Sequence, residues 1–261
     1  MRRLLRIVRE PFGVPVLARG WQRAVPILLG VGTLCVLGGL VIIWAARLTV
    51  PYPVYVSELG AHGAPTAGPF ALALLLIAAG GFAIAIASGH IRSSARWLDR
   101  WAPAVTLGFA AVCFVLASQI TCSANCPVPL VDPRSTPQDL IHTVSAVVGF
   151  GAACFAMLQV GFSRRLPRVS WLSRMSCAAV AVITIVGGLL AIVRVGADVG
   201  AWLELIGTTV AVGWIAVYAV ALTRIPVGVT EKSAGSAVGV EAGAGAAGAL
   251  ARGAGAAADV A

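Results

Sequence analysis

Six long stretches of the chain contain almost no residue that is charged at neutral pH. They are residues 26–46, 69–89, 102–121, 140–162, 175–193 and 203–223. A helix needs about 20 mostly apolar residues to cross the hydrocarbon core of a bilayer. Inside lipid each backbone N–H and C=O must find a partner within the protein, which favours helices. The sequence therefore predicts an all-α, polytopic membrane protein with a bundle of six transmembrane helices.

The composition agrees with a protein that is solvated by lipid. Charged residues make up 11% of the chain and hydrophobic residues 59%, whereas a soluble domain carries about 25% charged residues. The formal net charge is +9, but the basic residues form short clusters between apolar stretches, as topology signals do. We therefore expect the lipid bilayer as a partner and no nucleic acid.

The distribution of Lys and Arg predicts the orientation. Sixteen of the nineteen basic residues precede the first apolar stretch or follow the second, fourth and sixth. The alternate loops hold one each, namely Arg47, Arg134 and Arg194. Because cytoplasmic loops are enriched in Lys and Arg, we expect both termini in the cytoplasm. Aromatic residues near the predicted span ends are typical of membrane interfaces: Trp44, Tyr52, Tyr55, Trp97, Trp101, Trp171 and Trp202.

Three regions are expected along the chain. They are a basic cytoplasmic segment (1–25), the six-helix domain (26–223) and a disordered Ala/Gly-rich cytoplasmic tail (224–261). The first segment has the pattern of a short amphipathic helix at the inner headgroups. Its Arg2-Arg3 pair is typical of a twin-arginine signal, but the first apolar stretch begins too late and is too long for one. The Ala, Gly and Arg bias suggests a bacterial protein, and hence the bacterial inner membrane.

The polar residues near the spans concentrate in the outer loops. Residues 55–62 contain Ser57, Glu58 and His62, residues 122–128 contain two cysteines, and Glu204 opens the last span. Polar residues at membrane depth are costly and often functional. Ligand-binding candidates are Ser57, Glu58, His62, Asp139, His142 and Glu204, and the catalytic candidates among them are Ser57, His62, Asp139 and His142.

Asp139 and His142 are three residues apart at the start of a predicted helix, so they share a face. Asp139 would orient His142 as a proton carrier or metal ligand. In the alternative interpretation, Asp139 stabilises the helix N-terminus, with Thr136 or Gln138 as the cap, and His142 binds a loop carbonyl.

Ser57 and its neighbours allow similar alternatives. Ser57 can serve as a nucleophile with His62 or His142 as its base, and Glu58 with the two histidines can bind zinc. Otherwise Ser57 caps a short interfacial helix and Glu58 pairs with an arginine. No known metal or nucleophile motif supports the first two readings. We therefore assign no metal site, and the cofactors are unknown.

Cys122 and Cys126 lie in a loop that is expected to face an oxidising compartment. Their separation allows the sulfur atoms to bond, so we predict a disulfide, with free thiols or metal binding as alternatives. The other cysteines are interpreted as small packing residues. Glu204 either pairs with Arg194, reaches the Asp139 and His142 cluster, or extends harmlessly to the interface.

Taken together, these motifs resemble a known bacterial family. They are Ser57-Glu58-Leu59-Gly60, Cys122 with Cys126-Pro127, Asp139-x-x-His142, and Glu204 with Trp214. The chain resembles the integral membrane proteins of domain of unknown function 998 over residues 26–223. One departure is Glu204-Leu205, where that family is expected to have Glu-Arg. The resemblance implies a fold of about six spans and names no activity.

Three functions are weighed. In the first, the outer polar cluster recognises a lipid headgroup, an envelope component or a partner membrane protein. In the second, the chain is a membrane hydrolase that acts on lipid-linked substrates at the outer leaflet. In the third, it is a transporter. Transport usually needs ionisable residues near the midplane, and the central thirds of all six stretches lack charge. Whether the protein is an enzyme stays open, and recognition is the preferred hypothesis.

Overall fold

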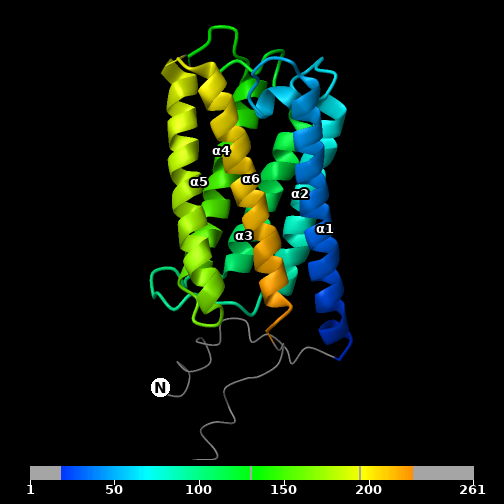
Figure 1. The fold of residues 1–261 in the computed structure, drawn as a ribbon, viewed down its shortest axis with the longest axis vertical. Coiled ribbons are helices and arrows are strands. Elements are labelled where there is room, and N and C mark those ends of the chain that lie inside the picture. Colours follow the sequence, from blue (N-terminus) through cyan, green and yellow to red (C-terminus); the bar gives the residue numbers. More distant parts are fainter. Residues whose placement is uncertain (1–18, 130, 194, 226–261) are drawn as a thin grey trace, which may run out of the picture. The chain divides into compact units, whose positions relative to one another are not determined.

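The computed structural model describes residues 19–129, 131–193 and 195–225, with side chains from residue 23 onward. This part of the chain contains six α-helices and one short 3₁₀ helix, and no strand (Figure 1). They are α1 (Arg19–Thr49), η2 (Ser57–Gly60), α2 (Ala67–Ala87), α3 (Pro103–Gln119), α4 (Pro137–Gly161), α5 (Pro167–Val193) and α6 (Ala197–Leu222). The predicted amphipathic segment near the N-terminus and the predicted tail beyond residue 225 lie outside the described residues.

The helices form a closed ring in chain order. Each packs against the next along the chain, and α6 returns to pack against α1. Because neighbours run in opposite directions, η2 and the loops α3–α4 and α5–α6 gather at one end of the bundle, at the top of Figure 1. We call this the η2 end. The loops α2–α3 and α4–α5 lie at the other end.

The outer surface of the ring is apolar. On α1, Ile27, Leu34 and Val41 follow one another at seven-residue intervals and are 65%, 72% and 66% exposed, while Val36 and Ile43 on the opposite face are fully buried. A helix that is hydrophobic on all faces belongs either in a large core or in a membrane. Among the described helices, five are long and apolar enough to cross a membrane, and α3, with 17 residues, is shorter.

Helices α4, α5 and α6 begin several residues before the predicted spans. Their first turns are polar, so hydropathy excludes them, but local chemistry makes them helical. Thr136 caps α4 and Pro137 occupies its first turn, where a proline loses no hydrogen bond. Pro167 likewise begins α5. The helices are therefore longer than the apolar stretches by which they were predicted.

Two glycines allow α1 and α2 to approach closely. A Cβ atom on Gly39 would lie 2.6 Å from the carbonyl oxygen of Ala73, and one on Gly80 would lie 2.5 Å from that of Gly32. Small residues at such contacts are typical of membrane helix pairs. The neighbouring Gly38 meets nothing within 4 Å, so only one member of that pair serves the contact.

Candidate ligand-binding site at the η2 end

A cavity of about 60 Å³ lies inside the ring, beneath η2. Residues from α1, α2, α3, α4 and α6 line it together with Val56 and Ser57. Its polar lining comes from Ser57, His142, Glu204 and Thr208, and the remainder is apolar or aromatic. Since one water needs about 10 to 15 Å³ of such space, the cavity holds several waters or one small chemical group.

Glu204 holds the segment that covers the cavity. Its Oε2 atom accepts the backbone N–H of Val56 at 2.7 Å. The backbone N–H and the hydroxyl of Ser57 also donate to this carboxylate. The half-buried Glu204 forms no ion pair with any described residue. A carboxylate near the start of α6, at the η2 end, thus binds the chain just before and at the start of η2.

The hydrogen bonds of His142 define its tautomer. Its Nδ1 atom lies 3.0 Å from the carbonyl oxygen of Ala117 and 2.7 Å from that of Ile120, at the end of α3. Carbonyl oxygens only accept, so Nδ1 must carry a proton. In the neutral ring, Nε2 then keeps a lone pair, because one nitrogen donates and the other accepts. The buried His142 side chain lines the cavity.

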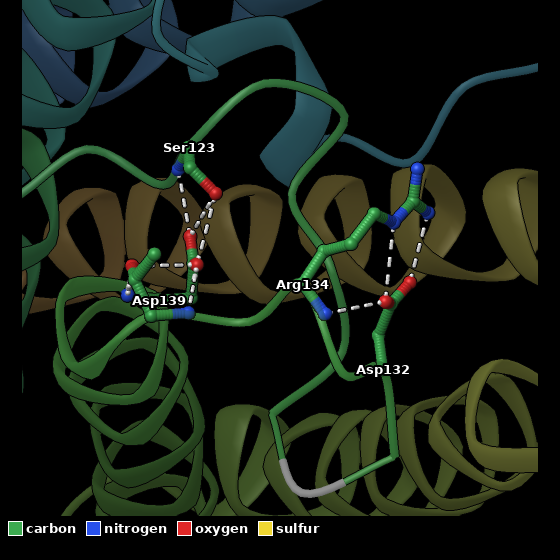
Figure 2. Close-up of polar contacts among 5 residues, drawn as sticks. Ser123, Asp132, Arg134 and Asp139 are labelled. Atoms are coloured by element: carbon green, nitrogen blue, oxygen red, sulfur yellow. Dashed lines mark hydrogen bonds and ion pairs between the residues drawn. The ribbon is translucent and has the colours of Figure 1, made fainter.

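Asp139 is occupied by contacts with the backbone and with hydroxyl groups. It accepts the N–H and hydroxyl of Ser123 and the N–H and hydroxyl of Thr136, at 2.6 to 3.0 Å (Figure 2). With Thr136 it completes a capping box at the start of α4. Gln138, the other predicted cap, donates instead to the carbonyl of Thr121. None of the hydrogen bonds of Asp139 goes to His142, so its contacts match the helix-capping interpretation.

The candidate residues between α1 and α2 do not all reach the cavity. Ser57 lines the cavity, and its hydroxyl is bound to Glu204 and not to a histidine. Glu58 is half-buried and forms no ion pair with a described residue; burial raises the pKa of its carboxyl group. The His62 side chain is exposed and is not part of the cavity lining. The structure thus brings Ser57, His142 and Glu204 to one cavity and leaves Glu58, His62 and Asp139 outside it.

Cys122 and Cys126 form a disulfide in the loop between α3 and α4. Asn125 and Cys126 have positive φ angles, which turn the chain back between the two sulfur atoms. A nitrogen of His142 and both sulfur atoms lie within 4.8 Å of one another. Cysteine binds metals as the thiolate, so the disulfide keeps both sulfur atoms from acting as ligands.

This loop also holds the chain around η2. The backbone N–H of His62 donates to the carbonyl of Cys122 at 2.8 Å, and the Cys122 Sγ atom lies 3.7 Å from the carbonyl oxygen of Ser57. We call residues 54–62 the η2 segment. Glu204 therefore attaches the η2 segment to α6, and Cys122 attaches it to the α3–α4 loop.

Tyr55 adds a contact between the η2 segment and α6. A Cβ atom on Gly200 would meet the Tyr55 ring, so a glycine is needed for that close approach. Burial raises the pKa of the Tyr55 hydroxyl, and the nearby Glu204 and Glu58 raise it further. This phenol is therefore a neutral hydrogen-bonding group at neutral pH.

Three contributors were missed in the sequence. Thr208 lies four residues after Glu204, so it shares its helix face, and this spacing could have revealed it. Ser123 binds Asp139 across a loop whose path no sequence pattern predicts. The backbone N–H of Val56 could not have been found from the sequence, because a backbone group is present at almost every residue and no side-chain pattern marks it.

The closed ring of apolar helices defines a polytopic α-helical membrane protein, with a small, partly polar cavity near one end. The chain belongs to the family described as protein of unknown function, DUF998, whose model matches residues 31–221. That range contains every residue that lines the cavity. No curated protein and no solved structure gives a significant match.

Proposed function

We propose that the chain is a six-span protein of the bacterial inner membrane with both termini in the cytoplasm. The basic residues of the two loops at the opposite end support this orientation, because Lys and Arg are retained on the cytoplasmic side. Exposed aromatic residues support the two interfaces: Tyr52 and Trp202 near the η2 end, and Trp97, Trp101 and Trp171 near the other. The η2 end then faces outward. The shorter α3 reaches the interfaces with help from polar flanking loops.

In this orientation the cavity at the η2 end recognises a ligand from the outer leaflet or the envelope, most simply a lipid headgroup. The observation that carries the proposal is that Ser57, His142 and Glu204, which are far apart in the sequence, line the same cavity. Pockets with mostly apolar walls and a few convergent polar groups are the usual form of small-ligand sites.

Lipids that remain bound after purification test the proposal. Native mass spectrometry on Ser57→Ala, His142→Ala and Glu204→Ala should show less retained lipid than the parent protein. The matched control is His62→Ala, whose exposed side chain lies outside the cavity lining. If the three cavity variants and the control all retain lipid like the parent protein, the cavity is not the recognition site.

A hydrolase acting on lipid-linked substrates is the second candidate. His142 lines the same cavity as Ser57, and in the neutral ring its Nε2 keeps the lone pair that a general base needs, which favours this candidate. The Ser57 hydroxyl is bound to Glu204 instead, so a substrate would have to displace that contact. A fluorophosphonate probe that labels the parent protein but not Ser57→Ala would favour hydrolysis over simple recognition.

A further inference from the structure

We propose that the group bound in the cavity is a primary ammonium, the amine of an ethanolamine headgroup or of a small free amine. The inference rests on the proposed recognition function and names its ligand class. The direction of the hydrogen bonds, the charge of the site, and its size and depth all favour such a group.

The polar groups around the cavity donate their hydrogen-bonding protons to other groups of the protein. The Ser57 hydroxyl donates to Glu204, and the Thr208 hydroxyl donates to the backbone carbonyl of Glu204 at 2.8 Å. The Nδ1 proton of His142 is directed at the carbonyls of α3. What remains is a set of lone pairs on two hydroxyls, an imidazole and a carboxylate. A ligand that fits this set must donate hydrogen bonds.

A cation would also find a partner in the site. Glu204 accepts three hydrogen bonds from neutral donors and has no cationic partner among the described residues. An ammonium group donates charge-assisted hydrogen bonds to a carboxylate and favours its ionised form. The described arginines at this end are engaged elsewhere: Arg47 lies over the Trp202 ring, and Arg134 pairs with Asp132. An ammonium ligand would neutralise Glu204.

Hydrogen-bonding capacity and bulk separate primary from quaternary ammonium groups. The small cavity has room for an amine, with its methylenes against the apolar wall. A trimethylammonium group is bulkier and has no N–H to donate to the four acceptors. We therefore expect ethanolamine to be bound and choline to be rejected.

The depth of the acceptors in the membrane allows a lipid headgroup to supply the amine. Glu204 lies seven residues into α6, which corresponds to about 10 Å along the helix axis from Ala197. The headgroup and interfacial layer on each side of the hydrocarbon core is about 5 to 8 Å thick. The acceptors thus lie near the boundary between headgroups and hydrocarbon, within reach of a headgroup amine.

The test measures the thermal stability of the full chain in nanodiscs. One arm compares phosphatidylglycerol discs with discs that also contain phosphatidylethanolamine or phosphatidylcholine. A second arm adds free ethanolamine or tetramethylammonium chloride to phosphatidylglycerol discs at equal ionic strength. A ligand present at ten times its Kd should raise the Tm by about 3 °C. Stabilisation by phosphatidylethanolamine alone identifies the lipid as the source, and stabilisation by free ethanolamine as well identifies a soluble amine.

Two variants connect the effect to the cavity. Glu204→Gln removes the charge and should abolish the shift. Thr208→Val removes one acceptor and the bond to the Glu204 backbone carbonyl, while it keeps the side-chain shape and the bond between the Glu204 carboxylate and Val56. It should weaken amine binding about tenfold, and it keeps the test decisive if Glu204→Gln does not fold. Equal stabilisation by ethanolamine and tetramethylammonium, or an amine effect that both variants retain, would overturn the inference.

The outcomes also separate this inference from the proposed function. If phosphatidylglycerol or phosphatidylcholine stabilises the protein and the effect is lost in Ser57→Ala and His142→Ala, recognition stands and the ammonium assignment fails. If no lipid or amine acts through these residues, both fail.

Discussion

The carboxylate of Glu204 accepts the backbone N–H of Val56 at 2.7 Å, although the two residues are 148 positions apart in the chain. The bond joins α6, at the η2 end of the bundle, to the η2 segment, directly above the cavity. It makes Glu204 both a wall of the cavity and an anchor for its cover.

Replacing this anchor should loosen the η2 segment. In Glu204→Ala the N–H groups of Val56 and Ser57 lose their acceptor, and each buried unpaired donor costs about 1 to 3 kcal/mol. We expect hydrogen exchange at Val56 and Ser57 to accelerate at least tenfold, as measured by mass spectrometry on peptides from residues 50–65. His62→Ala is the control, because its exposed side chain lies in the same segment but outside the cavity lining. Equal acceleration in both variants would mean that Glu204 is not the anchor.

Asp139 should matter for stability more than for recognition. Asp139→Ala removes the capping box of α4 and leaves the N–H groups of Ser123 and Thr136 without an acceptor. Losses of this kind should lower the free energy of unfolding by about 3 kcal/mol. Chemical denaturation in detergent would measure it. Arg134→Ala, which breaks the exposed ion pair also drawn in Figure 2, should change little. If the two variants are equally stable, the capping network is not important.

The sequence predicted the class of fold because the length and hydropathy of each apolar stretch indicate a buried or lipid-facing helix without reference to the rest of the chain. The gathering of Ser57, His142 and Glu204 was only one of several arrangements that it allowed. Whether Glu204 reaches Arg194, Asp139 or a backbone N–H depends on how the loops fold over the bundle. Asp139 and His142 illustrate the same limit, because their spacing predicted a shared face but not that Ser123 and Thr136 would occupy the carboxylate.

The two neighbouring glycines of α1 provide a matched pair of substitutions. Gly39→Ala would place a Cβ atom 2.6 Å from the Ala73 carbonyl oxygen and 2.7 Å from the Ile77 side chain, whereas Gly38→Ala meets open space. Overpacking of this kind costs about 1 to 3 kcal/mol. We expect Gly39→Ala to lower the Tm in detergent and Gly38→Ala to leave it unchanged or slightly higher. The reverse order would contradict the packing of α1 on α2.

His90, in the loop after α2, should make stability depend on pH. Burial lowers the pKa of its imidazole below the ordinary value of 6.5, and Arg165 lowers it further. The unfolded chain therefore binds a proton more readily, so this contribution is complete above pH 6.5 and is lost as the pH falls below it. His90→Gln should reduce the decrease in Tm between pH 7 and pH 5. The parent protein, measured in parallel, is the control. If His90→Gln leaves the pH dependence unchanged, His90 is not the titrating group.

The central claim is that the cavity lies at the outward end of a membrane bundle, and thiol labelling in intact cells tests it most directly. The four free cysteines are first replaced by alanine, and a single cysteine is then introduced by His62→Cys or by Arg92→Cys, both at exposed positions. The account predicts that a membrane-impermeant maleimide labels the His62→Cys protein in intact cells and the Arg92→Cys protein only after permeabilisation. Labelling of the Arg92→Cys protein alone in intact cells would place the cavity on the cytoplasmic side and contradict the account.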